Sequence, residues 1–422
     1  MRKSQIFFLD KMEKFRKLGI IEPLLKAINE EGFLEPTEIQ LKSIPYVVSG
    51  KDVIAGAATG SGKTLAFAAG IIQSVERGKG IQALILAPTR ELAVQITLEM
   101  KKFSKHKPMN VVDIYGGVGI TPQIEKLRRA DVVVGTPGRI LDHMERRTIN
   151  LTMVKVLVLD EADRMLDMGF IDDVKKIMGH CPMQKQTLLF SATIGKEIIF
   201  IADRFMHNAV KVSAESHVDP RKLKQVYYNV PENQKMSLLI HLLKHYHEGL
   251  IMIFCNSRHT TDFVANNLTK AGLPAYALHG GLSQDKRTQV ITHFHSKKVT
   301  VLIATDVAAR GLDIKGVSHV YNYDIPKESK QYVHRIGRTA RAGEAGKAVN
   351  MLSERDHDNF SKVLRDNDVN VERMELPEFE RMHFTHKSTE RGSRFGRDSG
   401  RPSRPSQRFG GNSRGGSFNR RR

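Results

Sequence analysis

The sequence has only two cysteines in 422 residues, Cys181 and Cys255. Two isolated cysteines build neither a disulfide framework nor a cysteine-based metal knuckle, which excludes a small secreted scaffold and a zinc ribbon. No apolar run approaches the ~18 residues that a membrane span needs. At the N-terminus, the apolar residues 6–9 are too few for a secretory signal. We therefore expect a protein of the reducing cytoplasm.

Acidic residues are too few to balance the basic ones. Lys and Arg total 66 against 46 Asp and Glu, which gives a formal net charge of +20. Such an excess favours polyanionic partners, because a phosphate neutralised by protein releases its condensed counterions. Nucleic acid is the first candidate among these partners.

The charge excess is concentrated at the C-terminus. Residues 391–422 contain ten Arg, no Lys and one acid, so they contribute +9. They also lack Val, Ile, Leu, Met and Ala, and cannot bury enough apolar surface to fold. We predict that residues 381–422 form a disordered basic tail that binds RNA through charge and stacking. The alternative is a tail that only raises solubility.

The rest of the chain has the composition of a folded protein, with 40% hydrophobic and 27% charged residues. Short apolar runs rich in β-branched residues recur along it, each followed by a turn and a helical pattern. These runs predict buried parallel strands. They cover residues 53–55, 83–86, 132–134, 156–159 and 187–190, and then 251–254, 275–278, 301–303 and 349–352.

A polar stretch at residues 213–220 divides the two groups of predicted strands. We predict an α/β protein with two parallel-sheet lobes, at residues 10–210 and 223–375, joined by a linker at 211–222. Ligands of parallel sheets bind beyond the carboxyl ends of the strands. The unusual residue clusters of this sequence directly follow the predicted strands, so they indicate the active face.

The first such cluster, A-A-T-G-S-G-K-T at residues 57–64, has the pattern of a P-loop. In this motif backbone N–H groups surround the phosphates of a nucleotide, while the lysine contacts the β- and γ-phosphates and the last hydroxyl binds Mg²⁺. A glycine-rich turn without a ligand is the alternative. We predict that the nucleotide-binding residues are Thr59, Gly60, Ser61, Gly62, Lys63 and Thr64.

A second cluster, Asp160-Glu161-Ala162-Asp163, follows the predicted strand 156–159. Carboxylates at the end of a buried strand are costly unless a cation or water receives them. We predict that Asp160 holds Mg²⁺ through water and that Glu161 is the general base for the attacking water. The alternative is a set of acids that cap a helix N-terminus.

With D-E-A-D, the P-loop and about a dozen motifs in order, the chain resembles the DEAD-box ATP-dependent RNA helicases of superfamily 2 over residues 10–370. The resemblance implies two RecA-like lobes and an RNA-stimulated ATPase, and the short N-terminal extension and Arg/Gly-rich tail indicate a prokaryotic member. It also implies that Gln40 hydrogen-bonds the adenine edge and that Phe15, seventeen residues before Gly32, stacks on the base.

The resemblance further implies two sets of RNA contacts. Hydroxyl groups, glycine amides and helix N-termini bind phosphate and sugar without reading bases, so binding should be independent of sequence. Any one of these short motifs alone would be explained by turn chemistry. The implied contacts are Pro88, Thr89, Arg90, Gly117, Thr136, Pro137 and Arg139 in the first lobe, and Gly280, Gln284, Arg287 and Thr305 in the second.

The second lobe is also implied to complete the ATP site. Arg338 and Arg341 resemble arginine fingers, which stabilise charge on the transferred phosphoryl group and are worth roughly 10³ to 10⁵ in rate. Gly311 and Asp313 match the segment in which the aspartate accepts from a ribose hydroxyl. Ala340 stands where the family usually has glycine, and we expect a modest effect on rate.

We therefore predict a monomeric ATP- and Mg²⁺-dependent RNA helicase that hydrolyses ATP on closing over single-stranded RNA and locally unwinds short duplexes. Ribosomal or RNA-decay assemblies are the predicted protein partners. Two alternatives remain open at this point. One is an ATP-gated RNA clamp or annealing chaperone with little net unwinding, and the other is a translocating DNA helicase on the same lobes.

Overall fold

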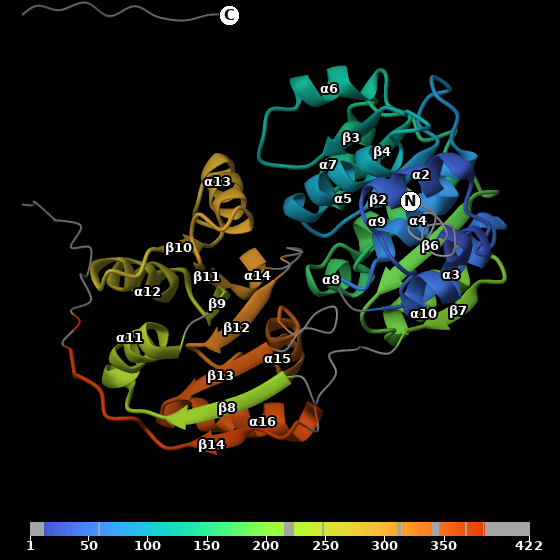
Figure 1. Cartoon of the computed structure of the whole chain (residues 1–422). Helices are drawn as coiled ribbons and strands as arrows, with labels where there is room; N and C mark the ends of the chain where they lie inside the picture. Colours follow the sequence, from blue (N-terminus) through green and yellow to red (C-terminus); the bar gives the residue numbers. More distant parts are fainter. Residues whose placement is uncertain are drawn as a thin grey trace, which may run out of the picture. The chain divides into compact units, whose positions relative to one another are not determined.

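A computed structural model describes residues 12–57, 60–214, 223–246, 249–309, 314, 316–339, 346–367, 369–382 and 384. It contains two lobes, each built on a seven-stranded sheet in which the paired strands run parallel. Figure 1 colours the first lobe from blue to green and the second from yellow-green to red. The predicted α/β class and the two parallel-sheet lobes are confirmed.

The first sheet has the strand order β3-β4-β2-β5-β6-β1-β7. Its strands are β1 (Val53–Gly56), β2 (Ala83–Leu86), β3 (Val111–Ile114), β4 (Val132–Gly135), β5 (Val156–Leu159), β6 (Gln186–Ser191) and β7 (Val210–Ser213). The helices are α2 (Glu22–Glu30), α3 (Glu38–Val48), α4 (Lys63–Ser74), α5 (Arg90–Phe103), α6 (Thr121–Leu127), α7 (Pro137–Glu145), α8 (Ala162–Asp167), α9 (Ile171–His180) and α10 (Lys196–Phe205).

Both faces of this sheet are buried, which explains the continuous apolar runs. Val53 and Ala55 of β1 enter one core with helices α2 to α5, while Ile54 enters the other core with helices α6 to α10. Successive strand residues point to opposite faces, so a strand covered on both sides needs apolar residues at every position.

The second sheet has the order β10-β11-β9-β12-β13-β8-β14. Its strands are β8 (Leu223–Asn229), β9 (Leu250–Cys255), β10 (Ala275–Leu278), β11 (Val301–Thr305), β12 (Val317–Asn322), β13 (Gly346–Leu352) and β14 (Glu372–Met374). Around it lie α11 (Lys235–Tyr246), α12 (Arg258–Lys270), α13 (Gln284–His295), α14 (Asp306–Ala309), α15 (Ser329–Ile336) and α16 (His357–Asn367), with the 3-10 turns η1 (Glu232–Gln234) and η3 (Glu354–Asp356).

The folded part of the second lobe extends further than predicted. After β14 the chain continues along the lobe, where Phe379, Met382 and Phe384 pack against the core that contains α11 and α12. The backbone N–H of Met382 also donates to Ser237 Oγ at 3.0 Å. The predicted boundaries at 375 and 381 are therefore too early, because these apolar side chains supply burial that residues 391–422 cannot.

Two predicted segments lie largely or wholly outside the described residues. They are positions 215–222 of the linker and positions 385–422 of the tail. Within the described part of the chain, no helix is both long and apolar enough to span a bilayer.

Candidate nucleotide and RNA site

The P-loop joins β1 to α4, as its sequence pattern predicts. Gly60 and Gly62 both adopt left-handed backbone conformations, with φ of 82° and 92°. Glycine is favoured at position 62 for two reasons: it adopts the left-handed conformation readily, and a side chain there would collide with the amide of Gln40. Helix α4 begins at Lys63. Its first N–H groups have no partner within the helix and form an anion-binding end.

Lys63 and Asp160 come together at the carboxyl edge of the first sheet. Lys63 Nζ lies 3.5 Å from Asp160 Oδ1, and both side chains are buried. Asp160 Oδ1 also accepts from the backbone N–H of Glu161 at 2.9 Å. Burial raises the pKa of Asp160, while the Lys63 ammonium opposes that rise. The structure therefore brings the P-loop lysine to the first carboxylate of the D-E-A-D segment.

Glu161 has an uncommon backbone. Its φ of 53° and ψ of 51° are left-handed, and it caps the N-terminus of α8. This conformation costs about 1–2 kcal/mol in a residue with a Cβ, so the surrounding structure must hold it. Glu161 Oε2 lies 2.6 Å from Arg164 Nη1, and both side chains are 4% exposed. Sequence reasoning missed Arg164, although it directly follows the D-E-A-D segment.

The loop after β5 is joined to the loop after β6. Asp163 Oδ2 accepts from the backbone N–H of Thr193 at 3.0 Å and from its hydroxyl at 3.1 Å. The N–H of Asp163 donates to Ser191 Oγ at 3.2 Å. A displacement of one loop therefore acts directly on the other.

Gln40 is fully buried and contacts the P-loop directly. Its Nε2 donates to Gly62 O at 3.0 Å, and its Oε1 accepts from the N–H of Thr37 at 2.9 Å. Thr37 Oγ1 donates to Ser61 O at 2.7 Å. Phe15 is fully buried in the apolar core that contains α2 to α5. The adenine contacts of Gln40 and Phe15 stay predictions.

Three loops with predicted RNA contacts adjoin one another in the first lobe. Thr89 caps α5 by accepting from the N–H of Leu92 at 3.3 Å, which leaves Arg90 as the first helical residue. The Arg90 guanidinium occupies the space that a side chain at Gly117 would need. Arg139 Nη2 donates to Val118 O at 3.1 Å. The loops after β2, β3 and β4 thus form one surface.

The remaining predicted contacts of that surface are Pro88, which precedes the Thr89 cap, and Thr136 and Pro137, which open α7. Thr136 is the N-cap residue and Pro137 is the first residue of the helix. Proline suits this position because its missing N–H would have no helical partner.

The predicted RNA contacts of the second lobe also gather at one sheet edge. Gly280 follows β10 and faces the guanidinium of Arg258. Gln284 is the first residue of α13, which also carries Arg287, and Thr305 is the last residue of β11. Because β10 and β11 are parallel neighbours, their carboxyl ends meet.

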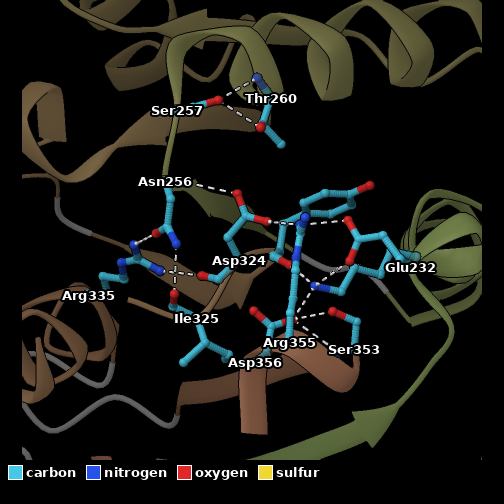
Figure 2. Close-up of polar contacts among 12 residues, drawn as sticks. Glu232, Asn256, Ser257, Thr260, Asp324, Ile325, Arg335, Ser353, Arg355 and Asp356 are labelled. Atoms are coloured by element: carbon cyan, nitrogen blue, oxygen red, sulfur yellow. Dashed lines mark hydrogen bonds and ion pairs between the residues drawn. The ribbon is translucent and has the colours of Figure 1, made fainter. Parts of the chain in front are cut away.

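Arg335 is the polar centre of the second lobe and is 1% exposed. Its Nε and Nη2 donate to the two carboxylate oxygens of Asp306 at 2.6 and 2.7 Å. Nη1 donates to Asp324 O at 2.6 Å, and Nη2 donates to Asn256 Oδ1 at 2.8 Å (Figure 2). The side chain therefore joins α15 to the loops after β9, β11 and β12. Arg338 lines a small cavity beside it.

Comparisons with known proteins agree with this geometry. A family profile described as DEAD/DEAH box helicase matches residues 37–200, and one described as helicase conserved C-terminal domain matches residues 234–343. The chain is 45% identical to the DEAD-box ATP-dependent RNA helicase CshA of Geobacillus kaustophilus over 370 residues, which cover 87% of this chain and 79% of the relative.

The CshA protein of Bacillus subtilis is 43% identical over 86% of this chain and 74% of the relative. This chain belongs to the DEAD-box ATP-dependent RNA helicases.

Solved structures extend the likeness. Yeast Dbp5 bound to RNA and ADP BeF3 has a TM-score of 0.77 and 32% identity, over 86% of this helicase and 96% of that chain. A DEAD box protein from Methanococcus jannaschii has a TM-score of 0.54 and 42% identity, over 86% of this helicase and 99% of that chain. The predicted RecA-like fold, ATP-dependent helicase activity and prokaryotic affinity are confirmed.

The described oxygen atoms of this helicase fit a hard divalent cation. Asp160 offers a buried carboxylate, and Thr64 offers a hydroxyl in the first turn of α4. Oxygen ligands of this kind are those that Mg²⁺ prefers in nucleotide sites. Four other predicted site residues of the helicase lie outside the described residues, and their roles stay predictions. They are Thr59, Gly311, Asp313 and Arg341.

A buried ion pair between Lys235 and Asp356 lies close to the hydrogen bonds of Arg335 (Figure 2). Lys235 is fully buried, and its Nζ donates to Asp356 Oδ2 at 2.6 Å and to Tyr323 O at 3.1 Å. Asp356 Oδ2 also accepts from the N–H of Ser353 at 3.0 Å (Figure 2). Burial by itself would raise the pKa of Asp356, but the Lys235 charge and these hydrogen bonds hold it below the usual value.

Proposed function

We propose that this helicase hydrolyses ATP only when its two lobes close over single-stranded RNA, and that closure separates short duplexes. The observation that carries this proposal is the division of the catalytic groups. Lys63, Asp160 and Glu161 belong to the first lobe, whereas Arg338 belongs to the second. Charge that develops on the γ-phosphoryl group needs cations from both lobes, so chemistry waits for closure.

Each group has a defined role in this proposal. Lys63 neutralises the β- and γ-phosphates, and Glu161 takes the proton from the attacking water. Arg338, together with Arg341, stabilises the transferred phosphoryl group. Thr64 and Asp160 would hold Mg²⁺, which supplies charge neutralisation and polarises the phosphoryl oxygens when bound. Gln40 selects adenine, because its amide offers one donor and one acceptor.

RNA binding in this proposal uses backbone contacts on both lobes. The first-lobe surface around Thr89, Gly117 and Thr136 and the second-lobe edge around Gly280 and Thr305 grip phosphate and sugar. Such contacts carry no base readout, so binding is independent of sequence. A grip that bends one strand is incompatible with an A-form duplex, which accounts for local unwinding. Ribosomal or RNA-decay assemblies are the proposed setting.

Two substitutions test the division of labour. Glu161→Gln should keep ATP and RNA binding but lose hydrolysis, because the amide cannot accept the proton of water. Arg338→Ala should keep nucleotide affinity and lose RNA-stimulated turnover by roughly 10³-fold or more. The measurements are ATPase rates with and without RNA, nucleotide titration and strand separation of a short duplex. Full RNA-stimulated turnover in Arg338→Ala would refute shared catalysis.

The same assays separate the alternatives. Stimulation by RNA and not by single-stranded DNA supports the RNA helicase over a DNA motor. An ATP-gated clamp would keep its duplex-remodelling effect in Glu161→Gln, because it needs ATP binding alone. A helicase with turnover instead becomes trapped on RNA in that variant, so strand release stops.

A further inference from the structure

A buried polar chain lies beneath the proposed RNA surface of the first lobe. His143 of α7 is fully buried, and Gln123 of α6 is 4% exposed. His143 Nε2 lies 3.4 Å from Gln123 Oε1, and Gln123 Nε2 donates to Tyr115 O at 3.0 Å. On the other side of the ring, Nδ1 lies 2.7 Å from Thr148 Oγ1. The chain therefore runs from α7 through α6 to the loop after β3.

The hydrogen bonds fix the form of the imidazole. Since Gln123 donates to Tyr115 O, its Oε1 must face His143, and the ring must carry a proton at Nε2. Nδ1 faces Thr148 Oγ1, whose hydroxyl donates to the backbone carbonyl of His143 at 3.1 Å. Burial lowers the pKa of His143, as do the charges of Arg139 and Arg146, while Asp142 opposes them. These effects favour the neutral form of the ring.

This chain connects two segments of the proposed RNA surface. Tyr115 directly precedes Gly116 and Gly117, and α7 begins just after the Thr136 cap. Arg139 makes a second bond between the same segments by donating to Val118 O at 3.1 Å. His143 is fully buried, and its helix α7 and the neighbouring α6 contribute Ile140 and Leu127 to the same apolar core.

A buried polar chain in such surroundings contributes little net stability compared with apolar side chains of the same volume. Its contribution is geometric, because only one arrangement of α6, α7 and the loop satisfies every polar atom. A shift of about 1 Å in positioned groups is enough to weaken binding strongly. The loop is therefore held in a defined register with the start of α7.

We propose that His143 and Gln123 are positioning residues that hold the 116–117 loop against the start of α7 and so set the affinity of the first lobe for RNA. This inference rests on the proposed RNA role of those two segments. Neither side chain touches RNA in this proposal, and neither takes part in nucleotide binding or hydrolysis.

The test compares His143→Leu, Gln123→Leu and the double variant in RNA-stimulated ATPase assays. Each single change should raise the RNA concentration for half-maximal stimulation by about tenfold, with the maximal rate and the KM for ATP unchanged. The double variant should be no worse than either single variant, because both break the same chain. His143→Gln keeps a donor near the Nε2 position and should restore most of the affinity.

His180→Leu is the matched control. His180 is exposed on α9, where its Nδ1 lies 2.8 Å from Lys176 O of the same helix. The His180→Leu variant should leave the half-maximal RNA concentration, the maximal rate and the KM for ATP unchanged. Thermal melting of all variants shows whether the lobe still folds.

Three results would overturn the inference. They are an unchanged half-maximal RNA concentration in both leucine variants, an equal rise in KM for ATP, and a His143→Gln variant as weak as His143→Leu. These results differ from a failure of the proposed function, in which the ATPase of the unmodified helicase would show no stimulation by RNA.

Discussion

Gly62→Ala tests whether the left-handed turn of the P-loop is required for nucleotide binding. An L-residue with a Cβ adopts this conformation at a cost of about 1–2 kcal/mol. A methyl group there would also collide with the Gln40 amide that donates to Gly62 O. Loss of that hydrogen bond costs a further ~0.5–1.5 kcal/mol. The variant loop should therefore leave this conformation when no nucleotide is bound.

Nucleotide binding must then restore the strained turn, so the penalty appears in the dissociation constant. The two contributions total about 1.5–3.5 kcal/mol, which is about a 10- to 400-fold loss of affinity. Titration with a fluorescent ADP analogue measures it directly. Gly179→Ala is the matched control, because Gly179 lies within α9 without a left-handed backbone and has open space around its Cα. That change should leave nucleotide affinity unchanged.

A double variant separates strain from collision. Because Gln40 belongs to the proposed adenine site, the effect of Gly62→Ala is measured in the Gln40→Ala background: it should vanish there if the collision with Gln40 dominates, and persist if the strain of the left-handed turn dominates. We expect Gly62→Ala to remain costly in that background, because the strain of the left-handed turn is the larger contribution and does not depend on Gln40. Wild-type affinity in Gly62→Ala itself would refute the reasoning.

Three further predictions concern stability and the tail. Lys235→Met leaves the buried Asp356 without its cationic partner, so the free energy of unfolding of the second lobe should fall by about 3–5 kcal/mol. Hydrogen exchange in α11 should be faster in this variant, and unchanged exchange there would contradict the prediction. Because the folded pKa of Asp356 is lowered, its stabilisation is complete above the unfolded value of about 3.9 and is lost as pH falls through the folded value. The melting difference between wild type and Asp356→Asn should accordingly shrink below about pH 4, and a constant difference would count against the pair. Deletion of residues 391–422 should weaken RNA affinity and flatten its salt dependence while RNA-saturated ATPase is kept, and an unchanged salt slope would rule out tail binding.

Most strands that sequence patterns predicted are buried on both faces, although the edge strand β10 was also predicted. β2, β5 and β9 lie inside their sheets and read as continuous apolar runs. Among the missed strands, β3, β7 and β14 lie at sheet edges and β8 lies next to an edge, and polar side chains such as Asp113, Lys211 and Lys224 interrupt the pattern. β12 is central in its sheet, but the polar Asn322 interrupts its apolar pattern in the sequence. Burial of Asn322 is tolerated because its amide donates to Asn350 Oδ1 at 2.8 Å.

The candidate site divides in the same way between local and long-range information. The P-loop and the D-E-A-D segment are each contiguous and each follow a recognisable strand, so the sequence marks Lys63 and Asp160 as site residues. Their proximity comes from the sheet, because β1 and β5 both pair parallel with β6 and their carboxyl ends lie at one edge. No comparable local signal marks His143, whose partners Gln123 and Tyr115 come from other elements.

Arg335 shows most clearly why a motif can be found before its function is understood. It lies three residues before Arg338, which the sequence identified, yet its partners follow three different strands. Asn256 follows β9, Asp306 follows β11 and Asp324 follows β12. A side chain with five N–H donors in a fixed plane can satisfy all three only after those strand ends have met. The arginine three residues before Arg338 therefore fixes the helix α15 that ends just before Arg338, and this role arises from the sheet topology and not from the motif.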